Sequence, residues 1–202
     1  MTLQLDLLRH GETEQGGGLR GSIDDALTIT GWAQLREALA AALSEQQSQP
    51  LWDRIVSSPL QRCARFAEEV AQVQGIPLSF DPALQELHFG DWEGLSSAEL
   101  MQQDASGLGQ FWADPYAFTP PNGEPLSQFE ARILASVQRL QQAHSGERIL
   151  VITHGGVMRL LLAQARCLPR SDLMQVSVDH AQLVKLAVAL DGKLRERICK
   201  NS

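Results

Sequence analysis

The chain contains 202 residues, of which 44% are hydrophobic, 20% charged and 5% aromatic. These fractions are those of an ordinary globular protein, so they exclude a disordered or fibrous chain, and the length predicts a single domain over residues 1–202. The formal net charge of −7 comes without any run of five like charges, so we expect no basic patch and no nucleic-acid partner.

Three short apolar runs predict buried parallel strands at residues 3–8, 54–57 and 148–153. Helical patterns follow at residues 30–47, 59–74, 126–144 and 155–165. Thr28 or Thr30 is placed to cap the first helix, and Ser127 is placed to cap the third. Asp191-Gly192, between apolar runs at residues 183–190 and 193–199, predicts a hairpin. Strands that alternate with helices indicate an α/β fold with a mainly parallel sheet.

Residues 91–125 interrupt this alternation. They are rich in aromatic residues and contain the turn-forming sequence Pro-Pro-Asn-Gly at positions 120–123. An insertion of this composition is more often a lid or a pocket wall than a linker between domains. We therefore expect a lid-like insertion over the functional site.

The residues best suited to chemistry follow the ends of the predicted strands. Arg9 and His10 come directly after the first strand, and His154 follows the third. Arg62 lies on the first turn of the helix that follows the second strand. Because ligands bind outside the carboxyl ends of strands in an open α/β sheet, these four side chains are expected at one binding edge. One histidine at a strand end is usually structural, but this joint placement favours a functional site.

The chemistry that suits these residue types is phosphoryl transfer. A guanidinium group is permanently charged and matches phosphate oxygens with two parallel hydrogen bonds. An imidazole can attack phosphorus as a covalent nucleophile. Gly11, Gly155 and Gly156 allow close approach of backbone and ligand, and the helix that begins near Gly155 offers N–H donors to an anion.

Four sequence blocks, in this order, resemble the histidine phosphatase superfamily, which includes cofactor-dependent phosphoglycerate mutase. They are residues 8–13 (LRHGET), 57–62 (SSPLQR), 84–94 (LQELHFGDWEG) and 153–156 (THGG). The order and spacing fit, and the blocks extend over nearly the whole chain. The resemblance implies a three-layer sandwich in which helices flank a mainly parallel, mixed sheet.

The resemblance also implies roles for individual residues. His10 becomes phosphorylated, and Glu86 is the proton donor and acceptor, which the reaction needs because the departing alkoxide must be protonated. The phosphoryl oxygens are held by Arg9, Arg62 and His154. Further contacts to the substrate or its phosphate are expected from Thr13, Arg20, Ser22 and Gly155.

One departure from the mutase pattern directs the functional prediction. Mutases of this family carry Asn six residues after the nucleophilic histidine, where this chain has Gly16, and they are longer. Residues 19–25 (LRGSIDD) resemble the α-ribazole-5′-phosphate phosphatases of cobalamin biosynthesis. The expected function is therefore hydrolysis of a small phosphate monoester, with α-ribazole-5′-phosphate as the first candidate. A phosphoglycerate mutase and a non-catalytic phospho-ligand binding module remain the alternatives.

No metal or other cofactor is expected. A metal site requires three or four ligands, whereas His10 and His154 supply two, and the neighbouring arginines would repel a cation. His180 lies outside the four blocks and His88 lies beside Glu86 in the third, and both are candidates for lining the pocket. The expected partner is a small-molecule phosphate ester, and the protein is expected to be a monomer or a homodimer.

The cysteines indicate the cellular compartment. Cys63, Cys167 and Cys199 are odd in number and widely spaced, which argues against a disulfide framework and fits a reducing compartment. The N-terminus lacks the layout of a signal peptide, and no apolar run approaches the roughly 20 residues that span a bilayer. We therefore expect a cytoplasmic protein without a membrane partner.

Overall fold

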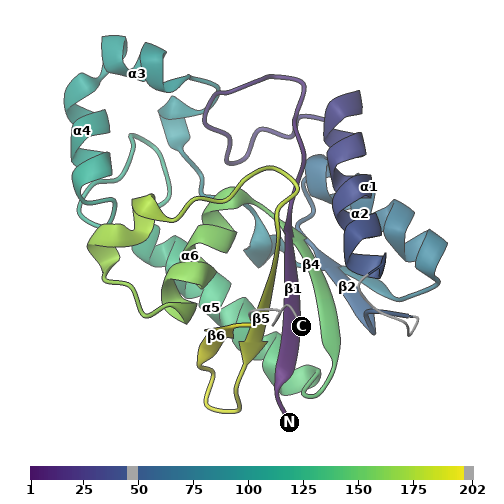
Figure 1. The fold of residues 1–202 in the computed structure, drawn as a ribbon. Helices are drawn as coiled ribbons and strands as arrows, with labels where there is room; N and C mark the ends of the chain where they lie inside the picture. The colour runs from purple at the N-terminus through teal and green to yellow at the C-terminus, as the bar shows by residue number, and fades with distance from the viewer. Residues whose placement is uncertain (45–49, 198–202) are drawn as a thin grey trace.

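The computed structural model describes residues 1–44 and 50–197, which form a central sheet with helices on both faces (Figure 1). The strands within these residues are β1 (Leu3–Arg9), β2 (Arg54–Ser57), β3 (Leu78–Phe80), β4 (Arg148–Thr153), β5 (Leu183–Val188) and β6 (Leu194–Glu196). Their order in the sheet is β3-β2-β4-β1-β5-β6.

The sheet is mainly parallel and mixed, which confirms the prediction. The first four strands of this order, β3, β2, β4 and β1, are parallel to one another. The last two are antiparallel: β5 pairs with β1, and β6 pairs with β5. The hairpin between β5 and β6 is confirmed as well, because Gly192 adopts a left-handed φ of 80° at its turn. Both strands are shorter than predicted, and residues 198–199 of the second lie outside the described residues.

The helices are α1 (Ile29–Ser44), α2 (Gln61–Gln74), α3 (Ser97–Gln103), α4 (Ala105–Ala113), α5 (Leu126–Ala143) and α6 (Gly155–Ala165). Figure 1 shows α1 and α2 on one face of the sheet and α5 and α6 on the other. Apolar side chains alternate along the strands and fill both interfaces: Leu7 of β1 belongs to one buried cluster and Leu8 to the other. The result is the expected three-layer sandwich.

The ends of the helices test the capping predictions. Thr28 caps α1, since its Oγ1 accepts a hydrogen bond from the backbone N–H of Gly31 at 2.9 Å. The prediction for Ser127 is wrong, because α5 begins at Leu126 with Pro125 at the cap position and no side-chain cap bond. Ser127 therefore lies inside the first turn, two positions after the cap residue Pro125. Residues 45–47 of the first predicted helix lie outside the described residues.

The insertion at residues 91–125 contains α3 and α4. Asp104 joins these two helices, and its Oδ1 accepts a hydrogen bond from Gly107 N at 2.9 Å. Trp92 packs edge-on against Phe111 at 5.7 Å between ring centroids and stacks on Phe118 at 5.6 Å. These aromatic contacts join parts of the insertion to one another. The insertion lies beyond the carboxyl end of β1 (Figure 1). None of the helices within residues 1–44 and 50–197 is long and apolar enough to cross a membrane.

Candidate active site

His10 lies just beyond β1, and its side chain is buried. Its Nδ1 is 2.8 Å from the carbonyl oxygen of Gly11. Because a carbonyl oxygen only accepts hydrogen bonds, Nδ1 carries the hydrogen and Nε2 keeps its lone pair. Burial, together with the charges of Arg62 and Arg9, lowers the pKa of His10 to about 3. His10 is thus a neutral imidazole at neutral pH, as a nucleophile must be.

His154 is fully buried beside His10, with 5.4 Å between the ring centroids. Arg62 donates from Nε to Nδ1 of His154 at 3.3 Å, so this nitrogen is the acceptor. The other nitrogen, Nε2, then carries the hydrogen and donates to Ser58 Oγ at 2.7 Å. Burial, reinforced by the charge of Arg62, lowers the pKa of His154 well below its usual value. His154 is therefore a neutral hydrogen-bond donor held in one orientation.

Arg62 is fully buried and is held by the loop of residues 16–28. Its guanidinium donates to the carbonyl oxygen of Gly21 at 3.1 Å and to that of Ile23. It also lies 3.4 Å from the carboxylate of Asp25, which forms a second ion pair with Arg20 at 3.0 Å. Asp25 thus balances two buried positive charges and connects the loop to α2.

Arg9 directly precedes His10, and its Nη1 donates to the carbonyl oxygen of Val178 at 2.7 Å. Its Nε is buried and has no hydrogen-bond partner within the described residues. A Cβ atom built on Gly155 would lie 3.2 Å from this Nε, so the glycine leaves the N–H accessible. Burial lowers the pKa of Arg9 from its usual value. Arg9 therefore offers a free donor close to His10, where an anion would be stabilised.

Glu86 is positioned by the first turn of α6. Its Oε2 accepts from Gly156 N at 2.9 Å, and its Oε1 accepts from Leu87 N at 2.9 Å. A Cβ atom on Gly156 would collide with Oε1, so only glycine allows this contact. Gly155 contacts Arg9 and Gly156 contacts Glu86, so the carboxylate lies near the guanidinium of Arg9, on which its charge acts.

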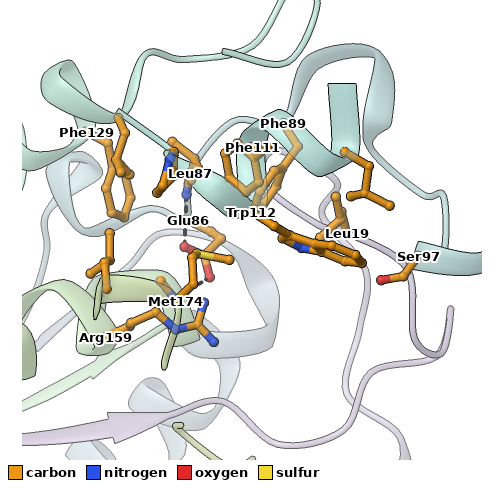
Figure 2. Close-up of a pocket in the computed structure, with 15 residues that line it drawn as sticks. Leu19, Glu86, Leu87, Phe89, Ser97, Phe111, Trp112, Phe129, Arg159 and Met174 are labelled. Carbon is orange, nitrogen blue, oxygen red and sulfur yellow. Dashed lines mark hydrogen bonds between the residues drawn. The ribbon is translucent and has the colours of Figure 1, made fainter. Parts of the chain in front are cut away.

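Glu86 also lines a cavity of about 110 Å³ between the insertion and α6. Figure 2 shows Glu86, Trp112 and Met174 around this cavity. Arg159 and Ser97 are its other polar lining side chains. The apolar lining comes mainly from Leu19, Phe89, Leu108, Phe111, Trp112 and Met174. The residues of the insertion that face the cavity were not identified individually from the sequence.

Three of the expected substrate contacts bond to the protein itself. Arg20 donates from Nη1 to Thr13 Oγ1 at 3.1 Å in addition to its ion pair with Asp25. Ser22 donates from its backbone N and its hydroxyl to Glu93, both at 2.8 Å. Asp25 and Glu93 lie within the sequence blocks singled out above, but nothing in the sequence pairs them with these partners.

The two further candidate histidines, His88 and His180, differ in position. The ring of His180 lies 5.7 Å from that of His10, so His180 belongs to the site. His88 instead lies 3.7 Å from a carboxylate oxygen of Glu93 and is half-buried. Within the described ranges, no three His, Cys, Asp or Glu side chains are arranged to hold a metal ion.

Comparison with known proteins places this geometry in a family. A family model of the histidine phosphatase superfamily (branch 1) matches residues 5–199. An adenosylcobalamin/alpha-ribazole phosphatase from Escherichia coli is 32% identical over 182 residues, which is 88% of this chain and 86% of that protein. A glucosyl-3-phosphoglycerate phosphatase from Mycolicibacterium vanbaalenii is 35% identical over 82% of this chain and 75% of that protein.

A solved structure agrees with these sequence comparisons. The alpha-ribazole phosphatase from Shigella flexneri superposes with a TM-score of 0.81 at 28% identity. The superposition covers 96% of this chain and 95% of that chain.

Proposed function

Because this chain belongs to the histidine phosphatase superfamily, we propose that it hydrolyses a small phosphate monoester through a phosphohistidine at His10. The observation that carries the proposal is the neutral His10 with a free Nε2, flanked by Arg9, Arg62 and His154. These three groups lie where charge develops on the phosphoryl oxygens during transfer. Catalysis of phosphoryl transfer depends mainly on such positioning and electrostatic stabilisation.

In the first step, Nε2 of His10 attacks phosphorus while the bond from phosphorus to the alcohol oxygen breaks. Glu86 supplies the proton that the departing oxygen needs. The imidazole now carries phosphorus on Nε2 and hydrogen on Nδ1, so it has a positive charge. The carbonyl oxygen of Gly11, 2.8 Å from Nδ1, accepts from this N–H and stabilises that charge.

In the second step, water attacks the same phosphorus and the P–N bond breaks. Glu86, now a carboxylate, accepts the proton of the attacking water. Inorganic phosphate is released, and His10 returns to the neutral form that burial favours. Arg9 and Arg62 contribute in both steps, because the charge on the phosphoryl oxygens has to be balanced throughout.

We propose α-ribazole-5′-phosphate as the substrate. The support comes from the cavity beside Glu86, which is largely apolar and aromatic. α-Ribazole carries a dimethylbenzimidazole ring, and an apolar ring gains more from such a lining than a hydroxyl-rich sugar does. The residues of the insertion, above all Phe111 and Trp112, would contact this ring. The free thiols of Cys63 and Cys167 support action in a reducing compartment, and we propose the cytoplasm.

The test measures phosphate release by the purified protein from three compounds: α-ribazole-5′-phosphate, glucosyl-3-phosphoglycerate and 3-phosphoglycerate. We expect the highest kcat/KM for the first compound and no turnover by H10A. The W112A variant removes an exposed aromatic side chain from the cavity. It should lower kcat/KM for α-ribazole-5′-phosphate about threefold to tenfold and leave that for ethyl phosphate unchanged.

Two outcomes would contradict the proposal. Undiminished turnover by H10A would exclude the phosphohistidine mechanism. A preference for glucosyl-3-phosphoglycerate, or efficient interconversion of 2- and 3-phosphoglycerate, would reject the proposed substrate and leave the mechanism standing.

A further inference from the structure

His180 is a second histidine whose ring lies close to that of His10. The ring of His10 has His154 at 5.4 Å and His180 at 5.7 Å, measured between centroids. His154 is fully buried, and both of its nitrogens are bonded to protein groups. His180 is exposed, and its ring has no hydrogen-bond partner among the residues that the structure describes. Its nitrogens are therefore available to a ligand on His10.

The position of His180 is built into the backbone. Ala181 N donates to the carbonyl oxygen of His10 at 3.2 Å, and Arg9 N donates to that of Gln182 at 3.1 Å. Ala181 has a φ of 54°, a left-handed conformation that is unfavourable for a residue with a Cβ atom. Strain of this kind persists where the surrounding structure requires it, frequently at functional sites. The segment of residues 178–182 thus holds His180 over His10.

The phosphoryl site has few donors on this open side. Most guanidinium donors of Arg62 already bond to the protein, through the loop of residues 16–28 and His154. The Nη1 group of Arg9 bonds to the backbone as well, and its buried Nε is a donor without a partner among the described residues. An additional donor facing solvent would complete the enclosure of a phosphoryl group on His10.

We propose that His180 binds the phosphoryl group, taking up a proton when the phosphate enters and donating it as a hydrogen bond to a phosphoryl oxygen. This inference rests on the proposed phosphohistidine mechanism and adds a phosphoryl-binding residue to it. The acid and base of the reaction remains Glu86, whose carboxylate accepts from Gly156 N.

The charges around His180 are consistent with proton uptake. Burial and the charge of Arg9 lower the pKa of His180, while the carboxylates of Glu12 and Asp179 act in the opposite direction. His10, the other titratable group facing it, is neutral. The free protein therefore has a neutral His180 at pH 7.5. A bound phosphate dianion adds negative charge next to the ring and favours its protonated form.

The experiment titrates inorganic phosphate into the protein by calorimetry at pH 7.5, in two buffers of different ionisation enthalpy. The two buffers together report the affinity and the number of protons taken up. The H180A variant should weaken phosphate binding about tenfold to a hundredfold, as expected for the loss of a hydrogen bond to a charged group. The H180Q variant, which keeps a neutral donor, should bind phosphate with an affinity between those of the wild type and H180A. It should also take up fewer protons per bound phosphate than the wild type, by a number nearer to one than to zero.

The matched control is H144Q. His144 follows α5, next to the amino end of β4 and therefore at the opposite edge of the sheet, where it pairs with Glu147 at 3.3 Å. H144Q should bind phosphate like the wild type. If H180Q and H180A match the wild type in affinity and proton uptake, the proposal for His180 is wrong. An equal fall in phosphate affinity in H180A, H180Q and H144Q would also overturn it. The activity of H10A tests the phosphohistidine mechanism separately.

Discussion

Asp25 is the residue whose replacement tests the architecture of the site most directly. Its side chain is 1% exposed and lies 3.0 Å from Arg20 Nη1 and 3.4 Å from Arg62 Nη1. The two guanidinium groups are themselves buried, with side chains 8% and 0% exposed. The substitution D25N keeps the size of the side chain and one acceptor oxygen but removes the negative charge. Two buried cations would then have no counter-charge.

Breaking a buried ion pair by removing one partner costs about 3–5 kcal/mol. Because Asn retains one acceptor, we expect the lower end, a loss of about 3 kcal/mol in the free energy of unfolding. For a chain of this length that corresponds to a fall in Tm of about 6–12 °C. Arg62 also loses one of the groups that orient it, and misplacement of a catalytic group by about 1 Å can cost about a hundredfold in rate. We expect phosphorylation of His10 to slow by about tenfold to a hundredfold.

The assay combines urea denaturation at pH 7 with single-turnover phosphorylation of His10. The matched control is D191N, which neutralises an exposed Asp paired with Lys193 at 3.2 Å. It replaces Asp-Gly by Asn-Gly, which also favours a hairpin turn. Exposed pairs contribute about 0–1 kcal/mol, so the control should stay within 1 kcal/mol of the wild type. If D25N were no less stable than D191N and phosphorylated His10 at the wild-type rate, the assignment of Asp25 as the shared counter-charge would be refuted.

The remaining predictions concern Glu86, the buried histidines and metal. E86Q should slow single-turnover phosphorylation of His10 by an alkyl phosphate about 10²–10⁴-fold. It should slow phosphorylation by p-nitrophenyl phosphate much less, because that leaving group needs no proton. Equal losses on the two substrates would make Glu86 a binding residue. G156A should reproduce this selectivity because its Cβ displaces the Glu86 carboxylate, whereas G17A, with open space around it, should match the wild type in the same assay. Burial lowers the pKa of His10 and His154, so below pH 6.5 the unfolded chain binds more protons than the folded chain. As the pH is lowered through this range, the free energy of unfolding should decrease by up to about 1.4 kcal/mol per pH unit for each histidine. H10Q should reduce this slope in urea titrations at pH 5 and 6. Activity should survive extended treatment with EDTA, because guanidinium and imidazole donors serve the phosphoryl oxygens; loss on chelation and recovery with zinc or magnesium would show that the site is misread.

The sequence predicts the strands and helices that carry the site because each has a strong local pattern. The apolar runs of β1, β2 and β4 are buried on both faces of the sheet, so they stand out from the polar segments around them. The short strand β3, of three residues with two exposed, has no such pattern and was not predicted. The same is true of α3 and α4, which have seven and nine residues. Isolated helices of this length are marginal in water, and packing of the insertion stabilises them.

The residues of the site divide in the same way. Arg9 ends β1, and His10 and His154 directly follow β1 and β4. Because these two strands are parallel, their direction alone brings the three residues to one edge of the sheet. The partners of the predicted residues could not be predicted. Ser58 bonds to His154, Asp25 pairs with Arg62 and Glu93 bonds to Ser22, and each pair joins distant parts of the chain.

His180 is the clearest case of what only the tertiary structure decided. Its nearness to His10 depends on the antiparallel pairing of β5 with β1 and on the left-handed backbone of Ala181. Neither feature has a local signal, since the pairing joins residues as far apart in the chain as Leu8 and Leu183, and alanine does not favour that conformation. Local patterns in the sequence thus determine which segments form strands and helices and which reactive residues follow them. The contacts that set charge, tautomer and access depend on long-range packing, which only the folded chain brings about.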